Sequence, residues 1–182
     1  MTRRVLPGPI AALAGFNAGL LFVCKWIAIA LLAAIAIIVA LGVFYRYVLN
    51  DALSWYEEIS KFLMVWLAFI GAPLGFKHGA HVAIELLPPL PALAKRMVRV
   101  LVWLIVVTLM ASLTYYGWWF SWNGRTQVAL TAGEISMFWI FVCMPIGAAI
   151  MGVVALEYLL RVVAGLGEPS AAEDEQITTQ GM

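Results

Sequence analysis

The chain has 182 residues, of which 64% are hydrophobic and 12% are charged, and its net charge is +1. An ordinary soluble domain is nearer half apolar and about a quarter charged, so this composition excludes a protein with a polar surface all round. The net charge gives no reason to expect a nucleic-acid partner.

Three stretches are free of charge and long enough to cross the roughly 30 Å hydrocarbon core of a membrane: residues 26–45, 100–122 and 135–156. A fourth, 54–76, has the right length but carries three charged residues near its start. Continuously apolar segments indicate helices rather than the alternating strands of a barrel. We therefore predict an all-α membrane protein with four spans at about 26–45, 54–76, 97–122 and 135–160.

Residues 1–25 precede the first span and are predicted to be a cytoplasmic or interfacial segment. An apolar stretch from Ile10 to Val23 lacks a small-x-small cleavage site, so we expect it to be retained. A single helix from Ile10 to Tyr45 would be about 54 Å long, which exceeds the bilayer core. A bend near Lys25, or a separate interfacial helix before it, is therefore expected.

The second helix is predicted to begin at Ser54, since Ser54 and Glu57 have the spacing of a capping box. Glu57, Glu58 and Lys61 are the only ionisable groups within a span that could serve transport. They permit two readings, a helix cap with an ion pair that supports a hairpin or subunit contact, or a transport site. Arg46 is likewise open: it is a snorkelling anchor, or it pairs with Glu57 or Glu58.

The remaining spans suggest packing rather than chemistry. Pro145 is expected to kink the fourth helix, and residues 162–182 form a polar, acidic tail that is predicted to be disordered. Cys24 and Cys143 lie near opposite ends of their spans, so buried free thiols are expected. Close helix approach is predicted at six small residues: Gly71, Ala72, Gly75, Gly147, Ala148 and Gly152.

No catalytic, cofactor or metal site is predicted. His78 and His81 share one gap, so they cannot provide an axial pair for a haem between spans, and only Glu85 lies near them as a further metal ligand. The sequence also lacks the common hydrolase, protease and phosphate-binding motifs. An enzyme is therefore not expected.

The positive charges are distributed unequally between the two sides of the membrane. With both termini on one side, eight Lys and Arg residues fall on that side and three on the other. By the positive-inside rule, both termini are then cytoplasmic. The eight are Arg3, Arg4, Lys25, Lys77, Lys95, Arg96, Arg99 and Arg161; the three are Arg46, Lys61 and Arg125.

The central third of the chain resembles the small permease subunit of tripartite ATP-independent periplasmic (TRAP) transporters, the DctQ-like family. The resemblance is carried by Phe44, Tyr45, Arg46, Tyr47, Val48, Leu49 and Asn50, by Leu53, Ser54, Trp55, Glu57, Glu58 and Trp66, and by Phe69, Gly71, Ala72, Lys77, Gly79, His81 and Glu85.

This resemblance implies a bacterial inner-membrane protein that supports a large, elevator-type membrane subunit and helps to dock a periplasmic binding protein. Sodium-coupled uptake of organic acids would then be carried out by the complex. A hairpin or subunit contact is assigned to Arg46, Ser54, Glu57, Glu58 and Lys61, and partner docking to Arg46, Asn50, Asp51, Trp55 and Arg125. A self-sufficient small oligomeric transporter or channel is the alternative.

Overall fold

The computed structural model describes residues 8–51, 55–85, 92–129 and 135–165. Within them, four helical stretches are long and apolar enough to cross a membrane: Ile10–Tyr47, Tyr56–Lys77, Arg96–Thr126 and Phe138–Val163. The predicted all-α fold with four spans is confirmed. The elements are α1 (Gly8–Tyr47), α2 (Tyr56–Glu85), α3 (Ala92–Asn123), the short 3-10 helix η1 (Gly124–Thr126), β1 (Val128–Ala129), β2 (Ile135–Ser136), α4 (Phe138–Phe141) and α5 (Cys143–Val163).

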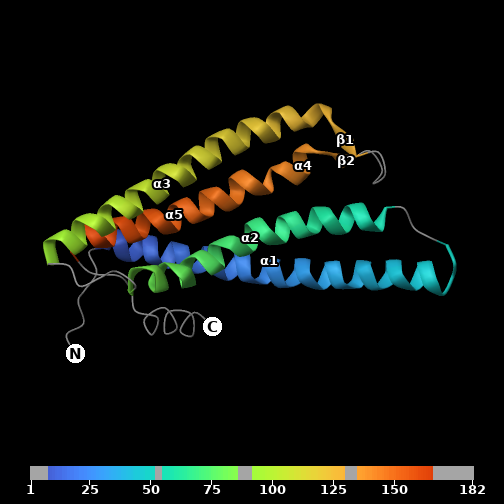
Figure 1. Ribbon diagram of the computed structural model, residues 1–182, viewed down its shortest axis with the longest axis horizontal. Coiled ribbons are helices and arrows are strands. Elements are labelled where there is room, and N and C mark those ends of the chain that lie inside the picture. Colours follow the sequence, from blue (N-terminus) through green and yellow to red (C-terminus); the bar gives the residue numbers. More distant parts are fainter. Residues whose placement is uncertain (1–7, 52–54, 86–91, 130–134, 166–182) are drawn as a thin grey trace.

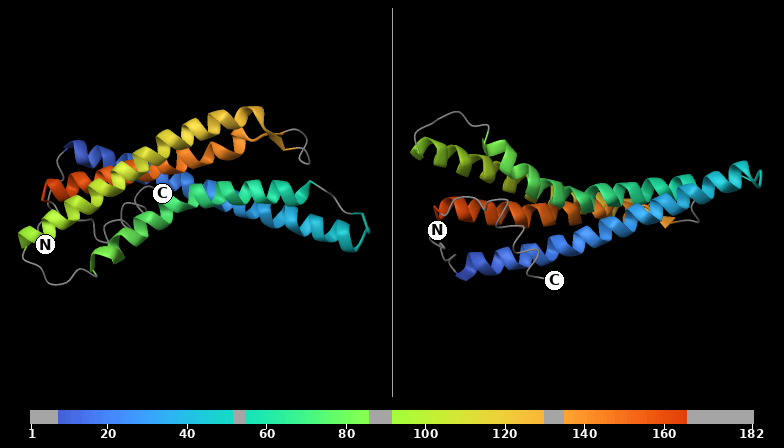
Figure 2. Two further views of the ribbon diagram at one scale, coloured as in Figure 1. Left: turned by 45° about the horizontal axis from the view of Figure 1, so that its top comes forward. Right: turned by 90° about the horizontal axis from the view of Figure 1, so that it is seen from below.

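The helices form two antiparallel pairs, α1 with α2 and α3 with α5 (Figure 1). The two pairs diverge toward the end that carries the α1–α2 connection and the β1–β2 hairpin. At the opposite end, α5 lies between α1 and the other two long helices (Figure 2). Because α5 contacts α1, α2 and α3, it is the most buried helix and forms the centre of the bundle.

Helix α1 runs without interruption through Lys25, so the separate helix that was considered before this residue is not observed. Its 40 residues correspond to about 60 Å of helix. The part before Lys25 packs against α5 through the buried residues Asn17 and Leu21, and Cys24 is buried as well. These positions are spaced by four and three residues, which keeps them on one face of a helix, so this segment is part of the bundle.

The core of the bundle lies on α3 and α5. The ring of Trp103 stacks on that of Tyr158, with centroids 4.8 Å apart and planes inclined by 7°. Leu21 of α1 and Val154 of α5 belong to the same buried cluster. This cluster joins three helices at the end of the molecule where α1 begins and α5 ends.

The fourth span is divided at Val142 into the short helix α4 and the longer α5. Pro145 has no amide hydrogen to donate to Phe141, four residues earlier, so the helical ladder loses one bond there. This is the expected site of a kink. The span begins at Phe138, because Ile135 and Ser136 pair with β1 instead.

Helices α2 and α5 approach closely at Gly147. A Cβ atom at this position would lie 2.5 Å from the backbone oxygen of Phe69. By contrast, Gly71 and Gly75 have no neighbouring atom within 4 Å of such a Cβ position. Gly147 on α5 therefore makes the close contact that was expected, whereas Gly71 and Gly75 on α2 do not.

Candidate functional site

Most of the predicted functional residues lie at or near the tip of the α1–α2 hairpin, and Arg125 lies apart from them. Helix α1 ends at Tyr47, and Asn50 follows in the left-handed conformation, with φ of 52°. Asparagine tolerates this conformation better than most residues. The amide of Asp51 then donates a hydrogen bond of 3.2 Å to the carbonyl of Tyr45. This turn fixes the direction in which the chain leaves α1.

Tyr56, the first residue of α2, packs its ring directly over Gly42 of α1. A side chain at Gly42 would collide with that ring, so only glycine leaves room for it. The hydroxyl of Tyr56 also donates a 3.2 Å hydrogen bond to Glu57. The two helices are therefore held together close to the tip of the hairpin.

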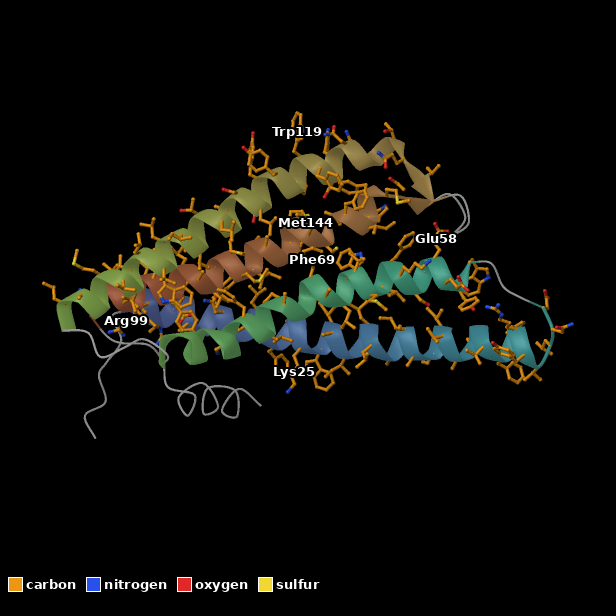
Figure 3. The ribbon with its side chains drawn as sticks, in the orientation of Figure 1. Lys25, Glu58, Phe69, Arg99, Trp119 and Met144 are labelled. Atoms are coloured by element: carbon orange, nitrogen blue, oxygen red, sulfur yellow. The ribbon has the colours of Figure 1, made fainter. Side chains whose placement is uncertain are left out.

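Arg46 lies 3.9 Å from Glu57, which supports the reading that this arginine pairs across the hairpin. Both side chains are more than half exposed, at 56% and 57%, so solvent screens the pair and it contributes little to the stability of the hairpin. Glu58 differs, because its Oε2 atom is buried without a hydrogen-bond partner in the first turn of α2 (Figure 3). Lys61 is exposed, and Ser54 lies outside the described residues.

The predicted docking residues fall on two separate parts of the structure. Arg46, Asn50, Asp51 and Trp55 surround the tip of the α1–α2 hairpin. Arg125 belongs to η1, at the end of α3, where its guanidinium carbon lies 3.1 Å from the centre of the Trp122 ring. Both parts lie toward the same end of the molecule (Figure 1). Any docking surface that uses both would have to bridge the two hairpins.

A buried polar cluster at the other end of the bundle was not predicted as a site. Glu157 accepts a 2.5 Å hydrogen bond from Asn17 of α1 and a 2.9 Å hydrogen bond from Arg161 one turn later on α5. The exposures of Asn17, Glu157 and Arg161 are 3%, 7% and 6%. The i,i+4 spacing of the charged pair is visible in the sequence, but the contact with Asn17 depends on how α1 packs against α5.

No group of three or more potential metal ligands occurs among the described residues. The side chains of His78, His81 and Glu85 lie outside the part that the structure describes. Cys24 and Cys143 are free and buried, as expected from their separation. Among the described residues, the arrangement consists of contacts between helices and of exposed polar side chains at the tip of the α1–α2 hairpin.

The family model for the DctQ component of tripartite ATP-independent periplasmic transporters matches residues 35–165. The chain belongs to this family. It is therefore a small permease component of a TRAP transporter, and a multi-pass protein of the bacterial inner membrane. The family is a class of transporter components and not of enzymes.

Three relatives agree with this assignment. A Haemophilus influenzae protein named as a TRAP transporter small permease is 46% identical over 59 residues, which cover 32% of this chain and 37% of that protein. The sialic acid TRAP transporter small permease protein SiaQ of Vibrio cholerae is 24% identical over 84% of this chain and 90% of its own length. The sialic acid TRAP transporter permease protein SiaT of Haemophilus influenzae is 27% identical over 70% of this chain and 21% of its own length.

Proposed function

We propose that this DctQ-family chain is a passive scaffold for a large, elevator-type membrane subunit and that it helps to dock a periplasmic substrate-binding protein. The complex takes up organic acids by sodium symport, and this chain has no catalytic activity of its own. The sialic acid named for SiaQ and SiaT is one member of that class of solutes. Membrane lipid covers the surfaces that the protein partners leave free.

The observation that carries the proposal is the pairing of Glu157 with Arg161, a buried ion pair at the end of the bundle where α1 begins and α5 ends. Glu157 and Arg161 neutralise each other within 2.6 Å, and Asn17 occupies the second carboxylate oxygen. A transport site needs an ionisable group that can exchange its partner for an ion or a solute. A carboxylate fixed by two buried neighbours is suited to holding helices together instead.

The fold also supports a common side for the two termini. Helix α1 begins and α5 ends at the same end of the bundle (Figure 1), as an even number of spans requires. The excess of positive charge on that side favours the cytoplasm. We therefore place the tip of the α1–α2 hairpin in the periplasm, where it meets the binding protein.

The length of the relative SiaT supports the proposal of a large membrane partner for this chain. The match with SiaT covers only 21% of that permease protein, so about four fifths of its sequence lies outside the shared region. Such a chain joins a segment similar to this protein with a much longer remainder. We infer that the corresponding remainder is supplied to this protein by a separate, large membrane subunit.

The experiment is detergent purification with an affinity tag on this chain, followed by identification of the membrane proteins that co-purify. A stable partner with many spans is the expected result. The alternative, a self-sufficient small oligomeric transporter or channel, predicts a lone oligomer that transports solute in liposomes. That result would overturn the scaffold proposal.

A further inference from the structure

Lys25 is exposed on α1 and projects away from the other helices (Figure 3). Its level along the bundle follows from the contacts of its neighbours. Asn17 contacts Glu157, and Leu21 packs in the cluster that contains Val154, so α1 and α5 run antiparallel in this region. Eight residues after Asn17, Lys25 is level with about residue 149 of α5, near the middle of the fourth span.

The positive residues of the other helices lie at different levels. Gly147 meets Phe69 on α2, which runs in the same direction as α5, so Lys77 is level with about residue 155. Gly152 meets Met110 on the antiparallel α3, so Arg99 is level with about residue 163. The levels of Lys25, Lys77 and Arg99 along the bundle axis therefore shift in one direction from α1 through α2 to α3. Between Lys25 and Arg99 it shifts by about 21 Å at 1.5 Å per residue.

The outer ends are staggered in the same sense. The contact of Gly42 with Tyr56 relates α1 to α2, and that of Gly147 with Phe69 relates α2 to α5. The contact of Gly117 with Pro145 relates α3 to α5. On this common scale, Arg46 lies about seven residues, or about 10 Å, beyond Arg125 along the bundle axis. The ribbon shows the same stagger, because the α1–α2 hairpin extends beyond β1 and β2 at one end and α3 extends beyond α1 at the other (Figure 1). The charge-free part of α1 is thus displaced outward as a whole.

A bilayer perpendicular to the bundle axis would leave the ammonium group of Lys25 facing lipid at mid-depth. This is strongly unfavourable for a charged side chain. An oblique bilayer removes the conflict, because Lys25, Lys77 and Arg99 then lie at the same depth, at one surface of the membrane. With two helix spacings of about 9 Å across the bundle, the staggers of about 21 Å and about 10 Å at the two ends correspond to tilts of roughly 50° and roughly 30°. Their mean lies at the upper end of the range for membrane helices.

We propose that the bundle sits tilted in the membrane and that the first half of α1 is a lipid-binding surface of the cytoplasmic leaflet. Phe16, Phe22 and Val23 are exposed on this segment and insert into the boundary between headgroups and acyl chains. Lys25 then reaches the phosphate level, where its charge complements the lipid. The choice of leaflet rests on the proposed cytoplasmic position of the termini. The depth of each residue follows from the contacts between the helices and does not depend on that choice.

Two exposed residues on the same face of α1 distinguish the tilted from the perpendicular arrangement. Val23 and Ile37 are two heptads apart and both are exposed. In the tilted arrangement Ile37 lies near the bilayer centre and Val23 at the headgroups. In the perpendicular arrangement Val23 is level with about residue 151 of α5, near the centre, and Ile37 with about residue 137, at the outer edge.

The experiment uses spin labels on Val23→Cys and Ile37→Cys in the full chain, reconstituted in nanodiscs of phosphatidylethanolamine and phosphatidylglycerol. Power saturation with oxygen and a water-soluble nickel chelate measures the depth of each label. The parent protein, treated with the same spin label, is the control. It should take up no label, since both native thiols are buried. Phe16→Cys and Val39→Cys provide a second exposed pair if one of the first variants does not fold.

We expect the label at residue 23 to be accessible to nickel and the label at residue 37 to be accessible mainly to oxygen. The opposite order would show a perpendicular bundle and overturn the proposal. Shielding of residue 23 from both reagents would mean that protein covers this face, which would overturn the assignment to lipid. These outcomes do not depend on the identity of the large subunit or of the transported solute, so they are separate from a failure of the proposed function.

Discussion

The side-chain amide of Asn17 donates a 2.5 Å hydrogen bond to the carboxylate of Glu157, a residue 140 positions later in the sequence, and so joins α1 to α5. The same carboxylate pairs with Arg161, and all three side chains are buried. A buried charge that loses its partner is costly, whereas replacing a whole pair by apolar residues is often tolerated. The cluster therefore makes a clear prediction about stability.

Glu157→Leu should lower the free energy of unfolding by about 3–5 kcal/mol, because it leaves Arg161 buried without its counter-ion. The double variant Glu157→Leu, Arg161→Leu should recover a large part of that loss. Thermal unfolding of the purified protein in detergent would measure both. Glu57→Leu is the control, since its pair with Arg46 is exposed to solvent and contributes little to stability. Equal losses at Glu57 and Glu157 would contradict the assigned roles.

Gly147→Ala should destabilise the contact between α2 and α5, because the added methyl group would lie 2.5 Å from the carbonyl oxygen of Phe69. Overpacking of this kind costs about 1–3 kcal/mol. Gly71→Ala, on the facing helix, has open space around the same atom and should be neutral or slightly stabilising. A comparison of their unfolding temperatures tests whether the helices meet at Gly147.

Gly42→Ala should disturb the outer hairpin, because the new Cβ would overlap the ring of Tyr56. Removing that ring in the double variant Gly42→Ala, Tyr56→Ala should relieve the clash. The two substitutions would then be non-additive, as expected for residues in contact. Hydrogen exchange of the amides of residues 40–60 would report the change locally. Additive effects would show that the two residues are not in contact.

Reversing charge at the proposed docking positions should weaken binding of the periplasmic protein. Asp51→Lys and Arg125→Glu are each expected to slow association on the order of tenfold at low salt, with a smaller effect at high salt. Surface plasmon resonance with the purified membrane complex would measure this. Co-purification of the large subunit should be unchanged, which separates docking from assembly. Unaltered association in both variants would remove the docking role.

The sequence predicted the elements of this protein well because hydrophobic length is a local property. A run of about 20 apolar residues must cross the bilayer as a helix wherever it is in the chain. The same holds for Pro145, whose missing amide interrupts the fourth span at Val142. The free state of Cys24 and Cys143 also followed from their positions along the spans.

Contacts between helices were predicted less well, because helices that are apolar all round give no direction for packing. Gly71 and Gly147 looked equally suited to close approach, and only the structure shows that Gly147 meets a neighbouring backbone. The uninterrupted course of α1 through Lys25 was also missed. That segment packs on α5 through Asn17 and Leu21, and its partner residues lie at the opposite end of the chain.

The sequence by itself determined the four spans, the family and the uneven distribution of charge, since each depends on the order and the type of residues along the chain. Only the tertiary structure decided that Glu157 is held by Asn17 and Arg161, and that the positive residues of α1, α2 and α3 lie at staggered levels. The physical reason is that the relative height of two helices is set by side-chain packing between them, which no property of either helix alone specifies.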